Sequence, residues 1–497
     1  ATNTTYTGVI SGSGGLTKQG TGIFTLSGNN TYTGATTINA GTLTLGAANR
    51  IADVSAVTVV GGATFNLNNF VETIGSLAGA GNVTLGTAAL TTGDATNTTY
   101  SGIMSGTGGL TKQGTGTFTL FGNNTYSGVT NVSAGTLVAA VNNALGTAAG
   151  GTTVAAGATL GFSGGINYAT AEPVTLNGGT LASLAGNNTF AGPTTLTANS
   201  AITVANGTTM TVGGTVNGGS QLNVTSGTGG INFLSAIGGT TPLSSLTATV
   251  GSISLGPVTT VGVQAYTGTT TLNGNLTTTN SAITLNSPVT LGANTVLTTG
   301  AGPITFGNTL NGAFSLTANS TGTTTFGGIV GGVTALTSLT TNAGGTTAIN
   351  GGSITTSGSE TYNDNITMNQ TTTLTSTGGT ITFGGNATSN AAGAGITVDA
   401  PIINLTGGTT VATTGNGPIN FFTDTLNPNG ASINVGTGAF SLSPNLVMRT
   451  IEFGDVDTGW VTDVYYGSNF AGVTAGSFTI GRPSHTGDIF VTGVAAA

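Results

Sequence analysis

One motif occurs twice in this chain at a fixed separation, and that spacing limits the folds open to it. Gly-Gly-Leu-Thr-Lys-Gln-Gly-Thr-Gly begins at Gly14 and again at Gly108, 94 residues later. The segments that follow, through Tyr32 in one copy and Tyr126 in the other, keep the same displacement. A unit repeated in register predicts a stacked architecture, in which each copy contacts its neighbours, rather than a globule around a single core.

Apolar residues fall at every second position over short runs, and this period predicts strands with one buried face and one solvated face. The clearest runs in the first repeat are Phe24-Thr25-Leu26, Leu43-Thr44-Leu45, Val57-Thr58-Val59, Phe65-Asn66-Leu67 and Val83-Thr84-Leu85. Glycine-rich breaks separate the runs, and glycine adopts the positive φ of tight turns at little cost. No window carries a sustained helical stripe of apolar residues.

Strands this short, joined by breaks too short for crossover helices, fold either into a sandwich or into a β-solenoid, in which each coil pairs with the next. A sandwich needs aromatic anchors and longer crossing loops, whereas aromatic residues are only 6% of this chain. The sequence therefore predicts an all-β parallel β-helix, or β-solenoid. At about 20 to 25 residues per coil and about 4.8 Å between coils, we expect on the order of 20 coils and a length of roughly 100 Å.

Four segments differ in repeat pattern. The first repeat family fills residues 1–150, degenerate coils fill 151–204, and a second repeat family fills 205–445. Residues 446–497 collect charged and aromatic side chains, and we expect C-terminal coils, a cap or a contact region there. No charge run or Pro-rich seam marks a linker between these segments.

The composition excludes several functions. The chain has only 5 Lys and Arg against 13 Asp and Glu, so it lacks the basic surface that binds nucleic acid or anionic lipid. No apolar run approaches the roughly 20 residues of a membrane helix, so we expect no membrane insertion. There is no cysteine, which suits a chain exported unfolded into an oxidising compartment.

Residues Gly14 to Leu43 carry the motif Gly-Gly-Leu-Thr-Lys-Gln-Gly-Thr-Gly, then Phe-Thr-Leu-Ser-Gly-Asn-Asn-Thr-Tyr, and strongly resemble the passenger-associated repeat of bacterial autotransporters. Residues 205–445 resemble repeats of large filamentous-haemagglutinin-like adhesins. The resemblance implies secretion across the outer membrane, a right-handed β-helix and an adhesive or structural role. The end of the given sequence has no run of amphipathic membrane strands, and no secretion domain is evident at its start, so we do not expect this chain to direct its own export by that route unless it was trimmed.

A carbohydrate-active β-helix, a polysaccharide lyase or hydrolase, is the alternative function. Such an enzyme needs carboxylates converging on one face. Asp53, Glu72 and Asp94 are each separated by about one coil and could stack. The equivalent positions one repeat later are uncharged. We therefore expect no catalytic residues.

Two features of the C-terminal segment suggest contacts. Asp455 and Asp457 form part of a calcium-loop pattern, but Tyr466 stands where the bidentate glutamate belongs, so we expect a solvated turn and no cofactor. Trp460, Tyr465 and Tyr466 are candidate interface anchors.

The first eight residues, including Thr5 and Tyr6, match Ala95 to Gly102 in mid-chain and so have the pattern of an interior coil. We expect this edge to meet another molecule, unless the chain is part of a longer one. Ala1 would suit a mature N-terminus left by signal-peptide cleavage.

Two residue types in the repeat have an architectural interpretation. The Asn pairs at 29–30, 123–124 and 187–188 are expected at turns, with left-handed geometry and hydrogen bonds along the stack. Lys18 and Lys112 are expected to be turn charges that discourage edge pairing.

The sequence thus predicts a non-enzymatic extracellular or cell-surface β-solenoid. It would serve as the shaft of a secreted adhesin or as a subunit of a self-assembling fibre. Its partners would be further copies end to end, or glycans or proteins of a host or neighbouring cell surface.

Overall fold

A computed structural model describes residues 2–445, 450–454, 463–467, 472–481, 486 and 489–492, with only the backbone of 450–454, 463–467 and 489–492. These residues form strands and turns and no helix. None of them belongs to a helix long and apolar enough to cross a membrane. They build about 21 turns of a parallel β-solenoid, which confirms the predicted fold class. Right-handedness and end-to-end stacking stay predictions.

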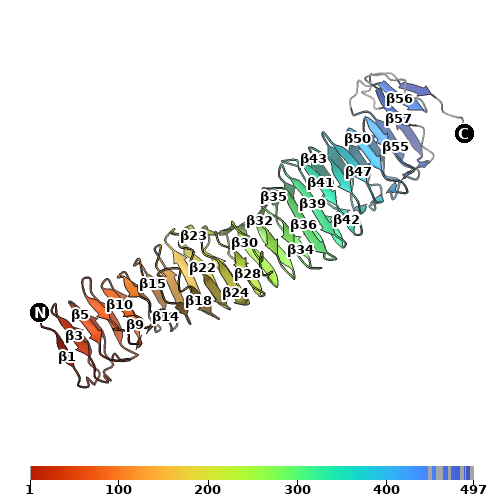
Figure 1. Cartoon of the computed structure of the whole chain (residues 1–497). Helices are drawn as coiled ribbons and strands as arrows, with labels where there is room; N and C mark the ends of the chain where they lie inside the picture. Colours follow the sequence, from red (N-terminus) through yellow and green to blue (C-terminus); the bar gives the residue numbers. More distant parts are fainter. Residues whose placement is uncertain are drawn as a thin grey trace. The chain divides into compact units, whose positions relative to one another are not determined.

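The chain divides into two compact units, Ala1–Ser254 and Leu255–Ala497. In each unit, the strands of successive coils lie side by side and run in the same direction (Figure 1). The division of the sequence into four repeat segments stays a prediction.

Three parallel sheets line the first unit. One consists of β1 (Thr4–Tyr6), β3 (Ile23–Leu26), β5 (Thr42–Leu45), β7 (Thr64–Asn66), β10 (Asn82–Gly86) and β13 (Met104–Gly106). Another consists of β8 (Glu72–Ile74), β11 (Leu90–Thr92), β14 (Leu110–Lys112), β16 (Thr130–Val132), β18 (Thr152–Ala155), β21 (Val174–Asn177), β24 (Thr194–Ala198) and β27 (Val216–Asn217). The third consists of β2 (Leu16–Lys18), β4 (Thr36–Ile38), β6 (Ala56–Val59), β9 (Ser76–Gly79), β12 (Thr98–Tyr100), β15 (Thr117–Leu120), β17 (Thr136–Ala139), β19 (Thr159–Ser163), β20 (Asn167–Tyr168), β22 (Thr180–Ala185), β23 (Asn188–Phe190), β25 (Ser200–Val204), β26 (Thr209–Val212), β28 (Gln221–Thr225), β29 (Gly230–Phe233) and β30 (Ser245–Leu255).

The second unit also has three sheets of parallel strands. One consists of β31 (Val258–Thr259), β33 (Leu276–Thr277), β36 (Thr295–Gly300), β39 (Ser315–Ser320), β41 (Ser338–Thr341), β44 (Glu360–Tyr362), β47 (Thr380–Phe383), β50 (Ile402–Leu405) and β53 (Thr425–Asn427). Another consists of β32 (Gln264–Leu272), β34 (Ile283–Leu285), β35 (Val289–Leu291), β37 (Ile304–Phe306), β38 (Leu310–Asn311), β40 (Thr323–Phe326), β42 (Thr346–Ile349), β45 (Asn365–Met368), β48 (Ala387–Ser389), β51 (Thr410–Thr413), β54 (Ser432–Asn434) and β58 (Val473–Thr474). The third consists of β43 (Ser353–Thr356), β46 (Thr372–Ser376), β49 (Ile396–Asp399), β52 (Ile419–Phe422), β55 (Ala439–Ser443) and β59 (Ser477–Ile480). A small separate sheet holds β57 (Asp463–Gly467), β56 (Thr450–Gly454) and β60 (Ile489–Thr492).

The period of two decides which side chains enter the interior. In β15, Phe118 and Leu120 are buried, while Thr117 and Thr119 face outward. Paired residues in the first unit are 18 positions apart at Thr64↔Asn82 and 24 apart at Gln221↔Ser245. The first of these coils is slightly shorter than the expected 20 to 25 residues, and the second lies within that range. Because the register is in phase from coil to coil, identical faces stack and the apolar interior is continuous within the unit.

Aromatic side chains stack along the interior. In the first unit the rings of Phe162 and Phe190 have centroids 5.3 Å apart, and Tyr168 lies 5.5 Å from Phe162. In the second unit Phe306 and Phe326 stack at 5.5 Å with an interplanar angle of 6°. Such pairs add about 0.5 to 1.5 kcal/mol each beyond the area that they bury.

Candidate functional site

The three carboxylates considered for catalysis do not converge on one exposed face. Glu72 is buried, and its two oxygens accept hydrogen bonds from the backbone N–H groups of Arg50 and Ile51 at 2.9 and 3.0 Å. Burial raises the pKa of Glu72 to about 7; the two N–H donors act in the opposite direction, and nearby Asp53 adds to the rise. The Asp94 carboxylate instead accepts bonds from the N–H and hydroxyl of Thr96. Glu72 is therefore a buried side chain that accepts hydrogen bonds from the backbone of the adjacent coil.

Some of the candidate interface residues of the segment 446–497 lie outside the residues that the structure describes. Trp460, and with it Asp455 and Asp457 of the considered calcium loop, lie outside the described residues. Tyr465 and Tyr466 are in β57, of which the backbone alone is described. Among the residues that the structure describes, no group of three or more His, Cys, Asp or Glu could hold a metal ion.

Thr5 and Tyr6 lie on β1, and the Tyr6 ring stacks on Phe24 of the next coil at 6.5 Å. The same tyrosine one repeat later, Tyr100, is buried and donates its hydroxyl to the Gly81 carbonyl at 2.7 Å. Tyr6 is thus a core-type side chain, which becomes buried where a coil precedes it. A contact role for Thr5 and Tyr6 stays a prediction.

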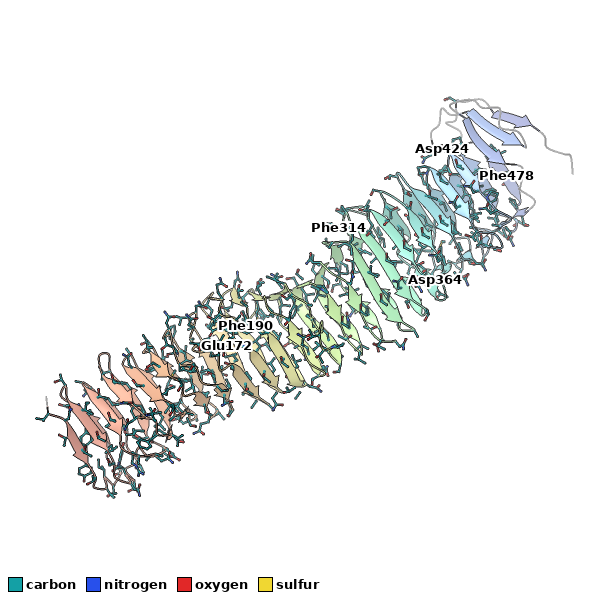
Figure 2. The ribbon with its side chains drawn as sticks, in the orientation of Figure 1. Glu172, Phe190, Phe314, Asp364, Asp424 and Phe478 are labelled. Atoms are coloured by element: carbon teal, nitrogen blue, oxygen red, sulfur yellow. The ribbon has the colours of Figure 1, made fainter. Side chains whose placement is uncertain are left out.

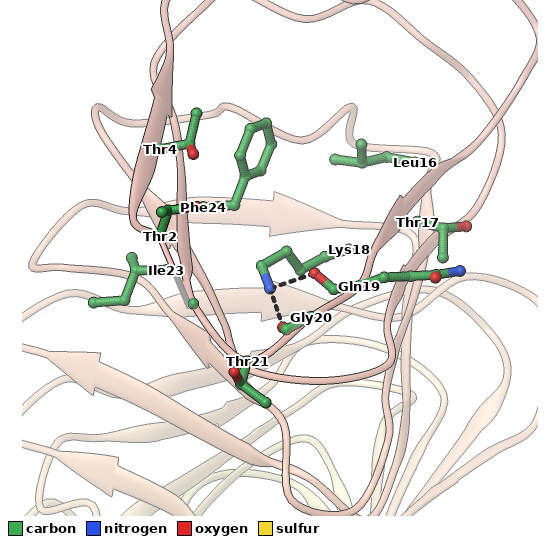
Figure 3. A pocket seen from close by; sticks show the side chains of 11 residues that line it. Thr2, Thr4, Leu16, Thr17, Lys18, Gln19, Gly20, Thr21, Ile23 and Phe24 are labelled. Carbon is green, nitrogen blue, oxygen red and sulfur yellow. Dashed lines mark hydrogen bonds between the residues drawn. The ribbon is translucent and has the colours of Figure 1, made fainter.

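The lysine of the repeated motif was expected to be a turn charge that discourages edge pairing, but its ammonium is bonded between coils. The Lys112 ammonium donates to the carbonyls of Gln113, Gly114 and Ala134 at 2.8, 2.9 and 3.1 Å, and the side chain is 1% exposed. Lys18 makes the equivalent three bonds, two of which Figure 3 draws. Burial lowers the pKa of both lysines. The lysine therefore joins the turns of two successive coils.

The hollow beside Lys18, about 450 Å³ and lined by residues from Thr2 to Phe24, has a structural explanation (Figure 3). In the second repeat a preceding coil occupies the corresponding place: a Cβ on Gly93 would lie only 3.1 Å from the Cδ atom of Lys112. The hollow therefore corresponds to a place that the stack fills in the second repeat, and we assign no ligand to it.

The second asparagine of each Asn pair lies inside the stack. Asn124 accepts a bond from the Met104 N–H at 2.8 Å and donates to the Ala144 carbonyl at 2.5 Å, so it spans three coils. Asn30 makes the equivalent bonds to Ile10 and Arg50. Hydrogen bonding along the stack is thus confirmed. The left-handed geometry expected at these pairs is wrong, because the positive-φ asparagines are others, such as Asn49 and Asn143.

Buried carboxyl groups recur in both units, and the sequence did not reveal them. Burial raises the pKa of Glu172 to about 7 and that of Glu360 to about 8, and it also raises the pKa of Asp364 (Figure 2 labels Glu172 and Asp364). Glu360 accepts bonds from Tyr362 and Thr356 at 2.8 and 3.2 Å. These acids are packed among core side chains.

The preceding repeat supplies an uncharged version of this Glu360 cluster. Gln264, Tyr266 and Thr260 stand 96 residues before Glu360, Tyr362 and Thr356. Gln264 accepts a bond from the Tyr266 hydroxyl at 3.0 Å and donates to Thr260 at 3.3 Å. Because an amide occupies the same place with the same partners, a neutral carboxyl suits the Glu360 site.

One outward-facing feature of the first unit is not explained by the core. Thr99, Thr119, Phe121, Val138, Ala140, Ser163, Gly164 and Leu184 line a groove of about 570 Å³, called the outer groove below. Phe121 is 49% and Leu184 42% exposed. Sequence reasoning missed the groove, although a comparison of the two repeats carries a signal: Ser27 and Thr44 stand where the second copy has Phe121 and Val138.

Comparison with known proteins identifies the repeated motif. The passenger-associated-transport-repeat profile matches residues 16–45, 110–139 and 183–198, as the resemblance predicted. The chain is also 38% identical over 145 residues, 28% of its length, to a protein named Adhesin BmaC autotransporter from Brucella suis biovar 1 (strain 1330). The matched part spans 4% of that relative's length. No solved structure matches the chain.

Proposed function

Because the chain carries passenger-associated-transport repeats in a β-solenoid, we propose that it is a segment of a secreted, surface-exposed autotransporter passenger with an adhesive role. In this proposal the segment has no enzymatic activity and acts as a shaft that presents adhesive surfaces to a host or neighbouring cell. The whole relative is far longer than this chain, so the proposal concerns the segment alone.

The observation that carries the proposal is that residues within the matched repeats join successive coils. Lys112 and Asn124 lie within the match at 110–139, and each bonds to the coil that follows. A sequence in which the identifying residues hold coils together suits a passenger that folds coil by coil after export. Few charges and no cysteine are compatible with that route.

Surface display provides the test. Intact producing cells would be treated with a non-specific protease, and fragments from residues 2–445 would be identified by mass spectrometry. We expect these fragments to be released while a cytoplasmic control protein stays intact. Protection of the segment until the cells are lysed would contradict the proposal.

Adhesion and self-assembly are separated by two further measurements. Beads coated with the purified chain should bind epithelial or bacterial cell surfaces more than beads coated with an unrelated β-protein. Electron micrographs of the same preparation test the fibre version, which requires end-to-end filaments; short single particles would exclude it. Turnover in a polysaccharide screen, abolished by Asp53→Asn, would instead favour the carbohydrate-active alternative.

A further inference from the structure

We propose that the outer groove of the first unit is a binding site for an uncharged oligosaccharide. The proposal rests on the proposed adhesive function for its biological setting, and it adds a place and a ligand class. The residues that form the groove come from β12, β15, β17, β19 and β22, and from the turns that follow them.

The groove interrupts a ladder of outward threonines. Along this ladder Thr119 pairs with Val138, Val138 with Gly161 and Gly161 with Ala182, before Thr203 resumes the pattern. Gly161 has no side chain of its own, so a neighbouring side chain can lie across the sheet at that point.

A bulge supplies one wall of the outer groove. The register between β19 and β22 shifts after Phe162↔Ser183, so that Ser163 pairs with Ala185 and Leu184 is the extra residue. Bulges re-aim side chains. Here Leu184 lies over Gly161, where a Cβ would come within 2.5 Å of the Leu184 Cδ1 atom. Gly161 is therefore required for Leu184 to lie across the sheet.

The opposite wall is an aromatic side chain that the fold does not need. Phe121 follows the last residue of β15 and is half exposed, whereas the first repeat has Ser27 in the same place and forms the same coil. Val138 likewise replaces Thr44. Both substitutions exchange a polar for an apolar side chain, and both line the outer groove, Phe121 as an exposed side chain and Val138 as a buried one, so the apolar lining is a local feature of the second repeat.

The chemistry of the lining favours a sugar. The apolar side chains of Phe121, Val138 and Leu184 stand beside the hydroxyl groups of Thr119 and Ser163. A hydroxyl group both donates and accepts, as a sugar hydroxyl does, and apolar pockets with a few placed polar groups are typical of small-ligand sites. The apolar face of a pyranose ring can lie on Phe121 while its hydroxyls bond to the rim.

The scarcity of charged side chains around the groove favours an uncharged ligand. Between residues 90 and 190 the only ionisable acids and bases of the Asp, Glu, Lys and Arg type are Asp94, Lys112 and Glu172. Lys112 and Glu172 are buried, and the Asp94 carboxylate accepts a hydrogen bond from the Thr96 N–H. A sulfated or uronate sugar would find no cation here, whereas an uncharged sugar needs none.

An extended peptide is a poorer fit. Peptides recognised by sheets add a strand at a free edge, through main-chain hydrogen bonds. The central strand below the groove, β17, already pairs with β15 and β19, so it offers no edge. From Thr99 to Leu184 the groove crosses four coil spacings, roughly 19 Å at about 4.8 Å each, which suits a chain of several sugars.

Titration calorimetry of the purified full chain tests the proposal. The probes are uncharged linear hexasaccharides (glucan, mannan and galactan), with a uronate hexasaccharide and a sulfated one as charged probes. We expect saturable binding of at least one uncharged probe and none of the charged ones. Phe121→Ser, which restores the first-repeat residue, should weaken binding at least about tenfold, or about 1.4 kcal/mol.

Controls separate loss of the site from loss of the fold. Val333→Thr changes an exposed side chain of the second unit and should bind as the unchanged chain does. Far-ultraviolet circular dichroism should be the same for all variants, and Leu184→Ala should also weaken binding. The proposal is overturned if no uncharged probe binds, if Phe121→Ser binds equally well, or if a charged probe binds instead. Self-association that depends on Phe121 would also overturn it, because a second copy of the chain would then be the ligand. Protease accessibility on cells tests the proposed function separately, and none of these binding results would change it.

Discussion

Glu360 makes a sharp prediction because the chain contains its own uncharged counterpart. Glu360 is fully buried, with Tyr362 and Thr356 as hydrogen-bond partners. We expect Glu360→Gln to reproduce the contacts of Gln264 and to remove a pH dependence from the stability of the second unit.

The sign and size follow from the two pKa values. Burial raises the pKa of Glu360 from 4.5 to about 8. Below pH 4.5 the carboxyl is protonated in both states and has no effect. Between pH 4.5 and about 8 the unfolded chain loses the proton while the folded chain keeps it, so stability falls as pH rises. The slope reaches about 1.4 kcal/mol per pH unit, and the total is on the order of 5 kcal/mol.

Urea unfolding followed by circular dichroism at pH 5, 6, 7 and 8 measures the effect. The difference in unfolding free energy between Glu360→Gln and the unchanged chain should increase steadily over this range. Subtraction removes the contributions of Asp364 and of the acids in the first unit, which both proteins share. Hydrogen exchange at β44 should change in the same direction at each pH.

The reciprocal variant is the matched control. Gln264→Glu should create the same fall in stability with pH, at a site 96 residues earlier in the same unit. Parallel pH profiles for Glu360→Gln and the unchanged chain would refute the reasoning, because they would mean that Glu360 is ionised in the folded state or reaches water.

Three other substitutions test the interior bonds of the second repeat. Lys112→Met should lower the unfolding free energy by about 1 to 3 kcal/mol because it leaves three carbonyls without a donor, and denaturant midpoints would measure this. Asn124→Ala should cost a similar amount and increase hydrogen exchange at the Met104 amide, whereas Asn123→Ala, at an exposed position, should change neither. Tyr126→Phe removes the 2.6 Å bond to the Thr130 hydroxyl and should cost about 1 kcal/mol by the same assay; an unchanged midpoint would show that the bond adds nothing.

Sequence reasoning was strongest for features that depend on neighbours along the chain. The 94-residue displacement and the period of two fixed which faces stack, because side chains alternate strictly across a strand. Phe118 and Leu120 were identifiable as core and Thr117 as surface from their positions alone. The motif around Lys112 was recognisable as architecture, but the lysine was predicted to be a turn charge that discourages edge pairing, not a buried donor between coils.

The interior polar groups and the outer groove depend on contacts between coils, which no local pattern carries. A lysine or glutamate at a turn is solvated or buried according to the coil stacked on it, and Lys112 is enclosed by Gly93 of the preceding coil. Phe121, Val138 and Leu184 are far apart in sequence and meet because parallel coils place residues about 20 positions apart side by side. The sequence by itself determined the repeat, the strands and the stack, whereas the tertiary structure decided what each coil covers and what it leaves open.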